Sequence, residues 1–460
     1  METFFNNLHL IQRNGKYIVF NATNTNLICI SKNTYRLLTD LQAGMSYEES
    51  AIKYSLDIIQ IKTLISKLGA KREQVHMSVP IISNVKPVIN RITLHVSNDC
   101  NLRCKYCYAA GGNYNMPTGM MSLNTAKMFV DFCIRTFSKI DNIVFFGGEP
   151  FLNPKAIEYI CSTFLQMKKG GRIDYYPKFG AITNGTINTG HTYSLINQYF
   201  SFLTISIDGP QEINDQNRVD CNGNGSYDRI VKFIKNVKSI SNISIKYEAT
   251  FTKQHKEKGY THSLIDHFIY SNFGIKGEVI NEQSFELDSN KSNNGKLIDV
   301  NLVSDETFMD ILSSIVYKKS KTMCALCRDI IAISINGDIY PCHMNVGEEN
   351  CCLGNIVSNN IFNDQDNYTR VQRGLKKKFK DNPKCNNCWA EKICGGCSRL
   401  WFYNPQKQIY NEFPNEYLCE SNKEYLEDIL YQIVCIRQDK KRWQGFIEKL
   451  MSNKKRILSQ

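Results

Sequence analysis

Three cysteines lie close together directly after an apolar segment. Cys100, Cys104 and Cys107 have the spacing Cys-x3-Cys-x2-Cys and follow the run Ile92 to Val96. Three thiolates at this spacing can hold one corner of a cubic [4Fe-4S] cluster and leave its fourth iron open to a cofactor or a substrate. Because the chain has 18 cysteines in 460 residues, a triplet at one fixed spacing is expected by chance only about 0.03 times. The alternatives are a zinc site without its fourth ligand and three unrelated buried thiols.

The segments around this triplet predict an α/β domain. From position 91 onward, apolar runs alternate with amphipathic helical stretches, several of which follow a Ser, Thr or Asn in the N-cap position. The expected strands are Ile92–Val96, Asn142–Phe146, Phe179–Thr183, Leu203–Ile207, Ile243–Thr250 and Gly274–Ile280. Six successive βα units predict a parallel sheet that curves into a partial (β/α)6 TIM-like barrel. Parallel α/β sheets carry their sites at the carboxyl ends of strands, where the cysteine loop falls.

The chain before the barrel predicts a small winged-helix-like module. Asn14-Gly15 is a hairpin turn signal between the first two of three short strands. The expected elements are strands at Leu8–Gln12, Tyr17–Phe20 and Asn26–Ile30 and helices over 32–41, 47–56 and 58–68. Such a module is more often a binding domain than a catalyst.

The chain after the barrel changes in composition. After position 320, Cys, Asn and Gly become dense and helical periodicity lapses until Asn422. A loop-rich segment of this length is expected to be held together by metals. The expected domains are 1–85, a binding module; 86–320, the partial barrel; 321–425, the loop-rich metal-binding part; and 426–460, a C-terminal helix with a basic tail.

Composition limits the compartment and the partners. No signal peptide and no membrane-spanning window are expected, and the 18 cysteines then indicate metal ligation in a reducing cytoplasm. The net charge of +12 is compatible with nucleic acid, an acidic peptide or a membrane surface. Solvated helix faces explain it equally well, and we expect neither a nucleic-acid nor a membrane partner.

The cysteine loop at the end of the first strand resembles the radical S-adenosylmethionine (SAM) superfamily. The resemblance implies that the open iron binds the methionine group of SAM and that electron transfer yields a 5′-deoxyadenosyl radical. It assigns Tyr106 to packing against adenine and Gly147, Gly148 and Glu149 to binding the methionine amine. The glycines would let backbone carbonyls approach a ligand closely, and Glu149 would offer its carboxylate to an ammonium group.

Two later segments resemble further parts of that cofactor site. Ser206 ends the fourth expected strand, where the family has a serine that contacts the cofactor. Arg218 precedes a glycine-rich stretch like that of the peptide-modifying branch; a surface salt bridge is its alternative role. Asp208 and Glu248 are strand-end acids that would face a cavity.

The C-terminal cysteines resemble the SPASM extension of the same superfamily. The spacing between Cys394 and Cys397 is one residue shorter than the common form, a shortening that some sactipeptide maturases share. One auxiliary [4Fe-4S] cluster would then be held by Cys385, Cys388, Cys394 and Cys419. The other would be held by Cys327, Cys342 and Cys397, with Cys324, Cys351 or Cys352 as candidates for the fourth ligand. Without a fourth ligand, its open iron could bind a substrate thiolate. Two zinc sites are the alternative.

Together these resemblances imply an oxidoreductase with three [4Fe-4S] clusters and SAM. It would modify a ribosomally made, Cys-rich precursor peptide, and Tyr340–His343 looks like thioether-forming maturases of the sactipeptide or ranthipeptide type. Residues 1–85 resemble the PqqD-like element that takes a leader peptide as an added strand. A flavodoxin or ferredoxin would donate electrons. His343 could carry a proton or orient a ligand, although a structural role is more usual.

Two other functions remain compatible with the sequence. An anaerobic sulfatase maturase, which oxidises Cys or Ser to formylglycine, shares the C-terminal cysteine pattern. It is disfavoured by the 85 residues before the cysteine loop and by His343, where that group carries an aspartate. The other is a zinc-bound nucleic-acid-binding protein with a winged-helix head and a basic tail.

Overall fold

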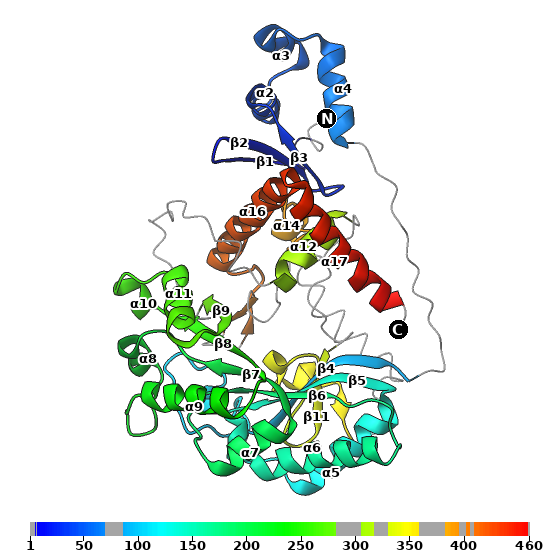
Figure 1. Cartoon of the computed structure of the whole chain (residues 1–460). Helices are drawn as coiled ribbons and strands as arrows, with labels where there is room; N and C mark the ends of the chain where they lie inside the picture. The colour runs from blue at the N-terminus through cyan, green and yellow to red at the C-terminus, as the bar shows by residue number, and fades with distance from the viewer. Residues whose placement is uncertain are drawn as a thin grey trace.

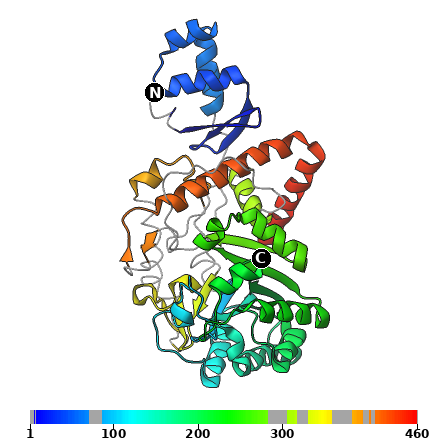
Figure 2. The same ribbon diagram turned by 90° about the vertical axis from the view of Figure 1, so that its left-hand side faces the viewer.

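The computed structural model of the chain describes residues 5, 7–69, 86–281, 305–316, 330–357, 382–394, 402–404 and 409–458. Three parts are stacked along the long direction of the molecule (Figure 1). An α/β barrel lies at one end, a small N-terminal module lies at the other, and a layer of C-terminal helices separates them. The same order is visible in the perpendicular view (Figure 2).

The barrel contains the six parallel strands that the sequence predicts. They are β4 (Val88–Ser97), β5 (Lys139–Gly147), β6 (Lys178–Thr183), β7 (Phe200–Ser206), β8 (Ser244–Phe251) and β9 (Lys276–Asn281). Neighbours in sequence are neighbours in the sheet. The helices that connect them are α5 (Leu123–Thr136), α6 (Pro154–Lys169), α7 (Gly190–Tyr199), α8 (Gln211–Asn217), α9 (Tyr227–Ile240), α10 (Lys253–Glu257) and α11 (His262–Phe273). The predicted α/β class is confirmed.

Side-chain caps fix where several of these helices begin. Ser122 accepts a hydrogen bond from the Thr125 backbone N–H at the start of α5, and Thr189 does the same for α7. Such caps satisfy N–H groups that the first helical turn leaves unpaired. The starts of α5 and α7 are therefore fixed by a local side-chain hydrogen bond.

The sheet extends beyond the six strands on the β4 side. β10 (Ile330–Ile333) pairs in parallel with β4, and β11 (Asp338–Tyr340) and β12 (Gly354–Asn355) continue it in antiparallel pairing. The sequence analysis did not predict these three short strands within the loop-rich segment. Their apolar runs are too short to indicate strands by themselves. β10 pairs with the edge of β4, more than two hundred residues earlier in the sequence, and β11 and β12 then extend the sheet from β10.

The N-terminal module has the predicted three strands and three helices. β1 (Leu8–Arg13), β2 (Lys16–Asn21) and β3 (Asn26–Ile30) form an antiparallel sheet in sequence order. The φ angles of Asn14 and Gly15 are 45° and 73°, as a two-residue hairpin turn requires. α2 (Lys32–Gln42), α3 (Tyr47–Tyr54) and α4 (Ile58–Gly69) follow and cover one face of the sheet.

The layer between the module and the barrel consists mainly of helices. It contains α12 (Asp305–Val316), α14 (Pro383–Asn386), α16 (Glu416–Gln438) and α17 (Lys440–Leu458), with the small β13 (Tyr403–Asn404) and β14 (Ile409–Tyr410) hairpin. Its apolar side chains form a core separate from that of the barrel. Within the described ranges, no helix is both long and apolar enough to cross a bilayer.

Candidate active site

The cysteine loop is pinned to the carboxyl end of β4 by short local hydrogen bonds. Ser97 Oγ accepts from the Asp99 N–H at 3.1 Å and donates to the Asp99 carbonyl at 2.9 Å. Asp99 Oδ1 accepts from the Cys100 N–H at 2.8 Å. These turns replace the strand's ladder bonds where β4 ends, so the loop begins in a defined direction.

The sulfur of Cys100 lies among N–H groups. The Leu102 backbone N–H donates to Cys100 Sγ at 3.4 Å, and Asn184 Nδ2 donates to it at 3.5 Å. Burial raises the pKa of Cys100 to about 12 and also raises the pKa of Cys104. These thiols therefore need a nearby positive charge to ionise, which a metal supplies. N–H donors to sulfur fit a cluster thiolate, so this observation supports an iron-sulfur ligand at Cys100.

Two glycines at the end of β5 touch the cysteine loop directly. The Gly148 N–H donates to the Ser97 carbonyl, and the Glu149 N–H donates to the Asp99 carbonyl, both at 2.9 Å. A Cβ on Gly147 would overlap the Ser97 carbonyl oxygen, and one on Gly148 would overlap that of Asp99. The sequence analysis expected these glycines to let backbone carbonyls approach a ligand closely. In the structure they admit the backbone of the cysteine loop.

The Glu149 carboxylate joins the ends of β5 and β6. It is fully buried and accepts hydrogen bonds from Thr183 Oγ1 at 2.8 Å, the Asn184 N–H at 2.7 Å and the Phe151 N–H at 3.1 Å. Burial raises its pKa to about 7, and these hydrogen bonds oppose that shift. The predicted ammonium ligand would bind the same Glu149 carboxylate that already accepts a hydrogen bond from the Asn184 N–H.

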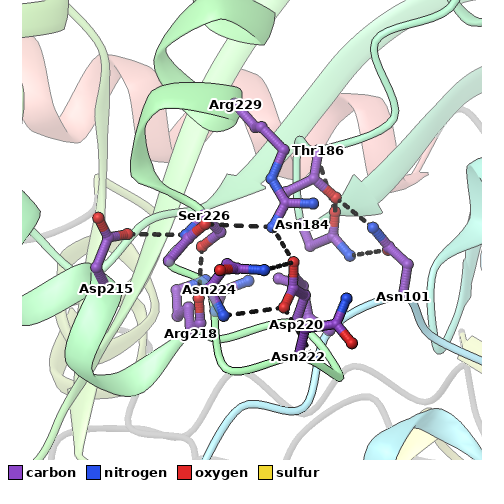
Figure 3. A network of polar contacts seen from close by, with 12 residues as sticks. Asn101, Asn184, Thr186, Asp215, Arg218, Asp220, Asn222, Asn224, Ser226 and Arg229 are labelled. Carbon is purple, nitrogen blue, oxygen red and sulfur yellow. Dashed lines mark hydrogen bonds and ion pairs between the residues drawn. The ribbon is translucent and has the colours of Figure 1, made fainter.

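Asn184 also belongs to a side-chain cluster that the sequence analysis missed. Its amide donates to Asn101 Oδ1, Asn101 donates to Thr186 Oγ1, each at 2.8 Å, and Thr186 Oγ1 donates to Asn184 Oδ1 at 2.6 Å (Figure 3). The residues after β6 thereby hold the loop between Cys100 and Cys104. Single Asn and Thr residues after a strand resemble ordinary turn residues, so the sequence pattern does not reveal this contact.

Arg218 lies inside the protein, so the surface salt bridge proposed as its alternative role is wrong. It is 5% exposed, and its Nη1 donates to the Tyr106 hydroxyl at 2.6 Å. That hydroxyl donates to Asp208 at 2.8 Å, and Asp208 is fully buried and accepts from the Thr250 N–H at 3.1 Å. Among the described residues, Arg218 Nε has no hydrogen-bond partner. A buried donor without a partner costs free energy. A carboxylate ligand that accepted a hydrogen bond from Arg218 Nε would remove that cost.

The segment that carries Arg218 pairs with the cysteine loop. The Arg103 N–H donates to the Val219 carbonyl at 2.6 Å, and the Lys105 N–H donates to the Asn217 carbonyl at 3.0 Å. Asp220 closes the following turn by accepting from the backbone N–H groups of Asn222 and Asn224, each at 3.0 Å (Figure 3). The loop of the triplet is thus paired on one side with this segment and packed on the other against Gly148.

Cys342 and His343 lie at the mouth of the barrel. His343 Nδ1 is 3.4 Å from Cys342 Sγ, and its ring packs edge-on against Phe146 at 5.1 Å between centroids. Burial lowers the pKa of His343 to about 4, with nearby Glu248 opposing that shift. His343 is therefore neutral near pH 7. Ser206 ends β7 and is paired in register with Glu248 of β8, so both lie at the same end of the sheet.

Four C-terminal cysteines lie in the helical layer. Burial raises the pKa of Cys385 to about 11, with smaller contributions from nearby Cys419 and Cys388. Cys394 Sγ accepts a hydrogen bond from Asn422 Nδ2 at 3.7 Å. Asn422 lies about one helical turn after Cys419 on α16. The fold thus places Cys385 near Cys388 and Cys419, but within the described part of the chain no three His, Cys, Asp or Glu side chains are grouped as ligands of a metal ion.

The second predicted set is only partly visible. Cys324, Cys327 and Cys397 lie outside the described residues, whereas Cys342 is placed at the barrel mouth. Cys351 Sγ donates to Glu348 and Cys352 Sγ donates to the Gly354 carbonyl, both at 3.4 Å. Each of these two candidate fourth ligands therefore has another partner.

Comparisons with known families agree with this architecture. Residues 94–250 match the radical SAM superfamily, and residues 324–389 match SPASM, an iron-sulfur cluster-binding domain. The chain is a radical SAM enzyme with a SPASM domain. Its cofactors are accordingly SAM, a SAM-binding [4Fe-4S] cluster and auxiliary clusters. These two matches favour an iron-sulfur enzyme over the zinc-bound nucleic-acid-binding alternative.

Related proteins include two kinds of maturation enzyme. This radical SAM enzyme is 26% identical over 356 residues to a Cys-type anaerobic sulfatase-maturating enzyme of Clostridium novyi, covering 72% of this chain and 92% of the relative. It is 22% identical over 400 residues to the subtilosin biosynthesis protein AlbA of Bacillus subtilis, covering 82% of this chain and 81% of that protein. The solved structure of anSMEcpe with bound AdoMet has 21% identity, covers 77% of this chain and all of that chain, and has a TM-score of 0.59. It supports the fold.

Replacing Gly148 with Ala tests the contact between β5 and the cysteine loop. We expect a loss of about 1–3 kcal/mol in the free energy of unfolding, because the new Cβ would overlap the Asp99 carbonyl oxygen, which accepts hydrogen bonds from Ser97 Oγ and the Glu149 N–H. Gly190→Ala is the matched control, since nothing lies within 4 Å of a Cβ there and Ala favours the helix. Denaturant unfolding of the two variants measures the difference. Equal stabilities would contradict the close backbone packing.

Proposed function

We propose that this radical SAM maturase forms Cys thioether cross-links in a ribosomally made, Cys-rich precursor peptide. The observation that carries the proposal is the N-terminal sheet, whose outer strand β3 offers a pairing edge for a leader peptide. The alignment with the sulfatase-maturating relative covers 92% of that enzyme but only 72% of this chain. This chain therefore has sequence beyond the part that such an enzyme matches, which a recognition module would account for.

In this proposal, Cys100, Cys104 and Cys107 hold the SAM-binding cluster. When bound, the cluster supplies the electron that cleaves SAM to a 5′-deoxyadenosyl radical. The chain's own residues would orient SAM: Arg218 Nε would donate to its carboxylate, Tyr106 would pack against adenine, and the turn at Gly147, Gly148 and Glu149 would bind its amine, with Ser206 at the neighbouring strand end. The unpaired, buried Arg218 Nε supports the carboxylate contact.

The auxiliary ligands in this proposal are the SPASM cysteines. Cys385, Cys388, Cys394 and Cys419 would complete one cluster, and Cys342 with Cys327 and Cys397 would hold the other. A pKa near 4 makes His343 a weak base. The 3.4 Å separation of His343 Nδ1 and Cys342 Sγ instead supports a role in orienting that ligand.

The leader peptide would add to the outer edge of β3 beyond Leu27, whose carbonyl accepts a hydrogen bond from Arg437 of α16 at 2.8 Å. Ile28 on this strand is 37% exposed, and it would contact an incoming peptide. The net charge of +12 favours an acidic leader. A flavodoxin or ferredoxin, also acidic as a class, would be the electron donor.

Formylglycine formation in a sulfatase is the second candidate function. The matching sulfatase-maturating relative favours it. Against it stands the N-terminal module described above.

Replacing Cys100, Cys104 and Cys107 together with Ala tests the cluster assignment. We expect reductive cleavage of SAM to disappear, because the SAM-binding cluster would lose its three cysteine ligands, while iron bound by the C-terminal cysteines remains. Chromatographic measurement of 5′-deoxyadenosine and an iron assay on the same anaerobic sample provide both readouts. Cleavage that persists would refute the assignment.

Replacing Ile28 with Asp tests the leader edge. We expect affinity for a synthetic leader peptide, taken from a precursor encoded beside the gene, to fall about ten-fold or more, because Asp removes an apolar contact and repels acidic residues. Fluorescence anisotropy measures the dissociation constant. Ile59→Asp, at a position on α4 that is 76% exposed, is the control. If both variants bind like the parent, the leader does not use β3.

The modified peptide distinguishes the two candidate functions. With a Cys-rich precursor, we expect a product that has lost two hydrogens and one free thiol for each cross-link, as a new sulfur–carbon bond requires. With a sulfatase-derived peptide, formylglycine would instead appear as an aldehyde that has lost its sulfur. Mass spectrometry after thiol alkylation identifies either product. Aldehyde formation without cross-linking would overturn the thioether proposal.

A further inference from the structure

The sheet of the N-terminal module is covered on both of its faces. Val19 points toward α2 and α4 and packs with Leu37 and Leu38. The neighbouring Ile18 and Phe20 point the other way, as strand alternation requires, and both are fully buried in the core of the helical layer. Figure 2 shows the module seated on α16 through this sheet. The module is therefore packed into the rest of the chain through a second apolar face.

One residue of this sheet reaches the turn that carries two candidate ligands. The His9 ring of β1 stacks on the Trp389 ring with 3.7 Å between centroids and an interplanar angle of 5°. Phe20 of β2 packs edge-on against the same indole at 6.1 Å. Trp389 directly follows Cys388, so these rings fix the backbone beside that cysteine.

The same histidine also contacts the helix that carries Cys419. His9 Nε2 lies 2.7 Å from Glu427 Oε1, and Glu427 is about two helical turns after Cys419 on α16. The next residue of this helix, Asp428, is 4% exposed and forms an ion pair with Arg13 at the end of β1. β1 is thus joined to both ligand-bearing elements, the turn at Cys388 and helix α16.

We propose that β1 is part of the auxiliary cluster site formed by Cys385, Cys388, Cys394 and Cys419, and that His9 is a positioning residue for it. The inference rests on the ligand assignment made under the proposed function. Cys388 and Cys419 come from segments separated by 30 residues, and His9 bridges them with its ring face on one and its nitrogen on the other. This bridge restricts their relative motion before metal binds, which favours binding because less conformational entropy is then lost.

This arrangement changes how the module can be studied. Deleting residues 1–85 would expose apolar side chains of α12 and α16 that now share a core with Ile18 and Phe20. Loss of activity after such a deletion would therefore combine lost leader binding with a disturbed cluster site. Single substitutions at the interface separate the two effects.

The test compares His9→Ala, His9→Phe and Lys16→Ala in the protein whose Cys100, Cys104 and Cys107 are replaced by Ala. Only auxiliary iron is then present, about eight atoms for two clusters. Lys16→Ala is the matched control, because Lys16 links the same sheet to the same helix through an exposed contact with Gln438 at 2.7 Å. The readouts are iron and sulfide per chain, the rate of iron release to a chelator, and the midpoint potential and EPR spectrum of the reduced clusters.

We expect His9→Ala to release iron from one cluster about ten-fold faster or more and to shift the potential and EPR spectrum of that cluster. His9→Phe retains the ring stacking on Trp389 but loses the contact with Glu427, so its release rate should lie between those of His9→Ala and the parent. Lys16→Ala should behave like the parent. Release rates and spectra that are equal in all proteins would overturn the inference. Equal acceleration by all three substitutions would also overturn it, since that result indicates general loosening of the interface. A parent that binds no auxiliary iron would instead refute the ligand assignment.

Discussion

Direct backbone contact between the cysteine loop and the end of β5 is the constraint on which the site depends. The Gly147 and Gly148 turn approaches Ser97 and Asp99 so closely that no side chain fits between them. Two backbone hydrogen bonds, from Gly148 and Glu149, hold the contact. The position of the three thiols therefore follows from the sheet, because β4 and β5 are adjacent and in fixed register.

A second set of contacts completes the position of this loop from the other side. The chain at Asn217 and Val219 pairs with Arg103 and Lys105, and it brings Arg218 to Tyr106 in the interior. Asn184 adds a donor to the sulfur of Cys100 and is itself held by the buried Glu149 carboxylate. Strands β4, β5 and β6 and the segment after α8 thus each contribute to one small region, which explains why the residues involved are scattered along the sequence.

The helical layer lies between the barrel and the N-terminal module and shares an apolar core with the module. Its apolar core includes residues from the N-terminal sheet as well as from α12 and α16. The turn at Cys388 lies where this sheet and α16 meet, because Trp389 stacks on His9. A change at the module can therefore reach the C-terminal cysteines through direct packing.

Much of this protein could be predicted from its sequence, because the relevant information is local. The Cys-x3-Cys-x2-Cys spacing, the Asn14-Gly15 turn and the alternation of apolar strands with capped helices each depend on residues a few positions apart. They determined the six parallel strands, the three-stranded module and the radical SAM class. The roles of Gly147 and Gly148 were predicted only in part, since their lack of a side chain indicates a close approach but not which group approaches.

Only the tertiary structure decided which distant residues meet. Arg218 and Tyr106 are 112 positions apart, and His9 contacts Glu427 across 418 positions. Pairing of β10 with β4 likewise joins segments from opposite ends of the barrel sequence. No local pattern encodes such contacts, because they arise from the packing of whole elements around a shared apolar core. The sequence therefore determined the chemistry of the ligands, and the fold determined what surrounds and positions them.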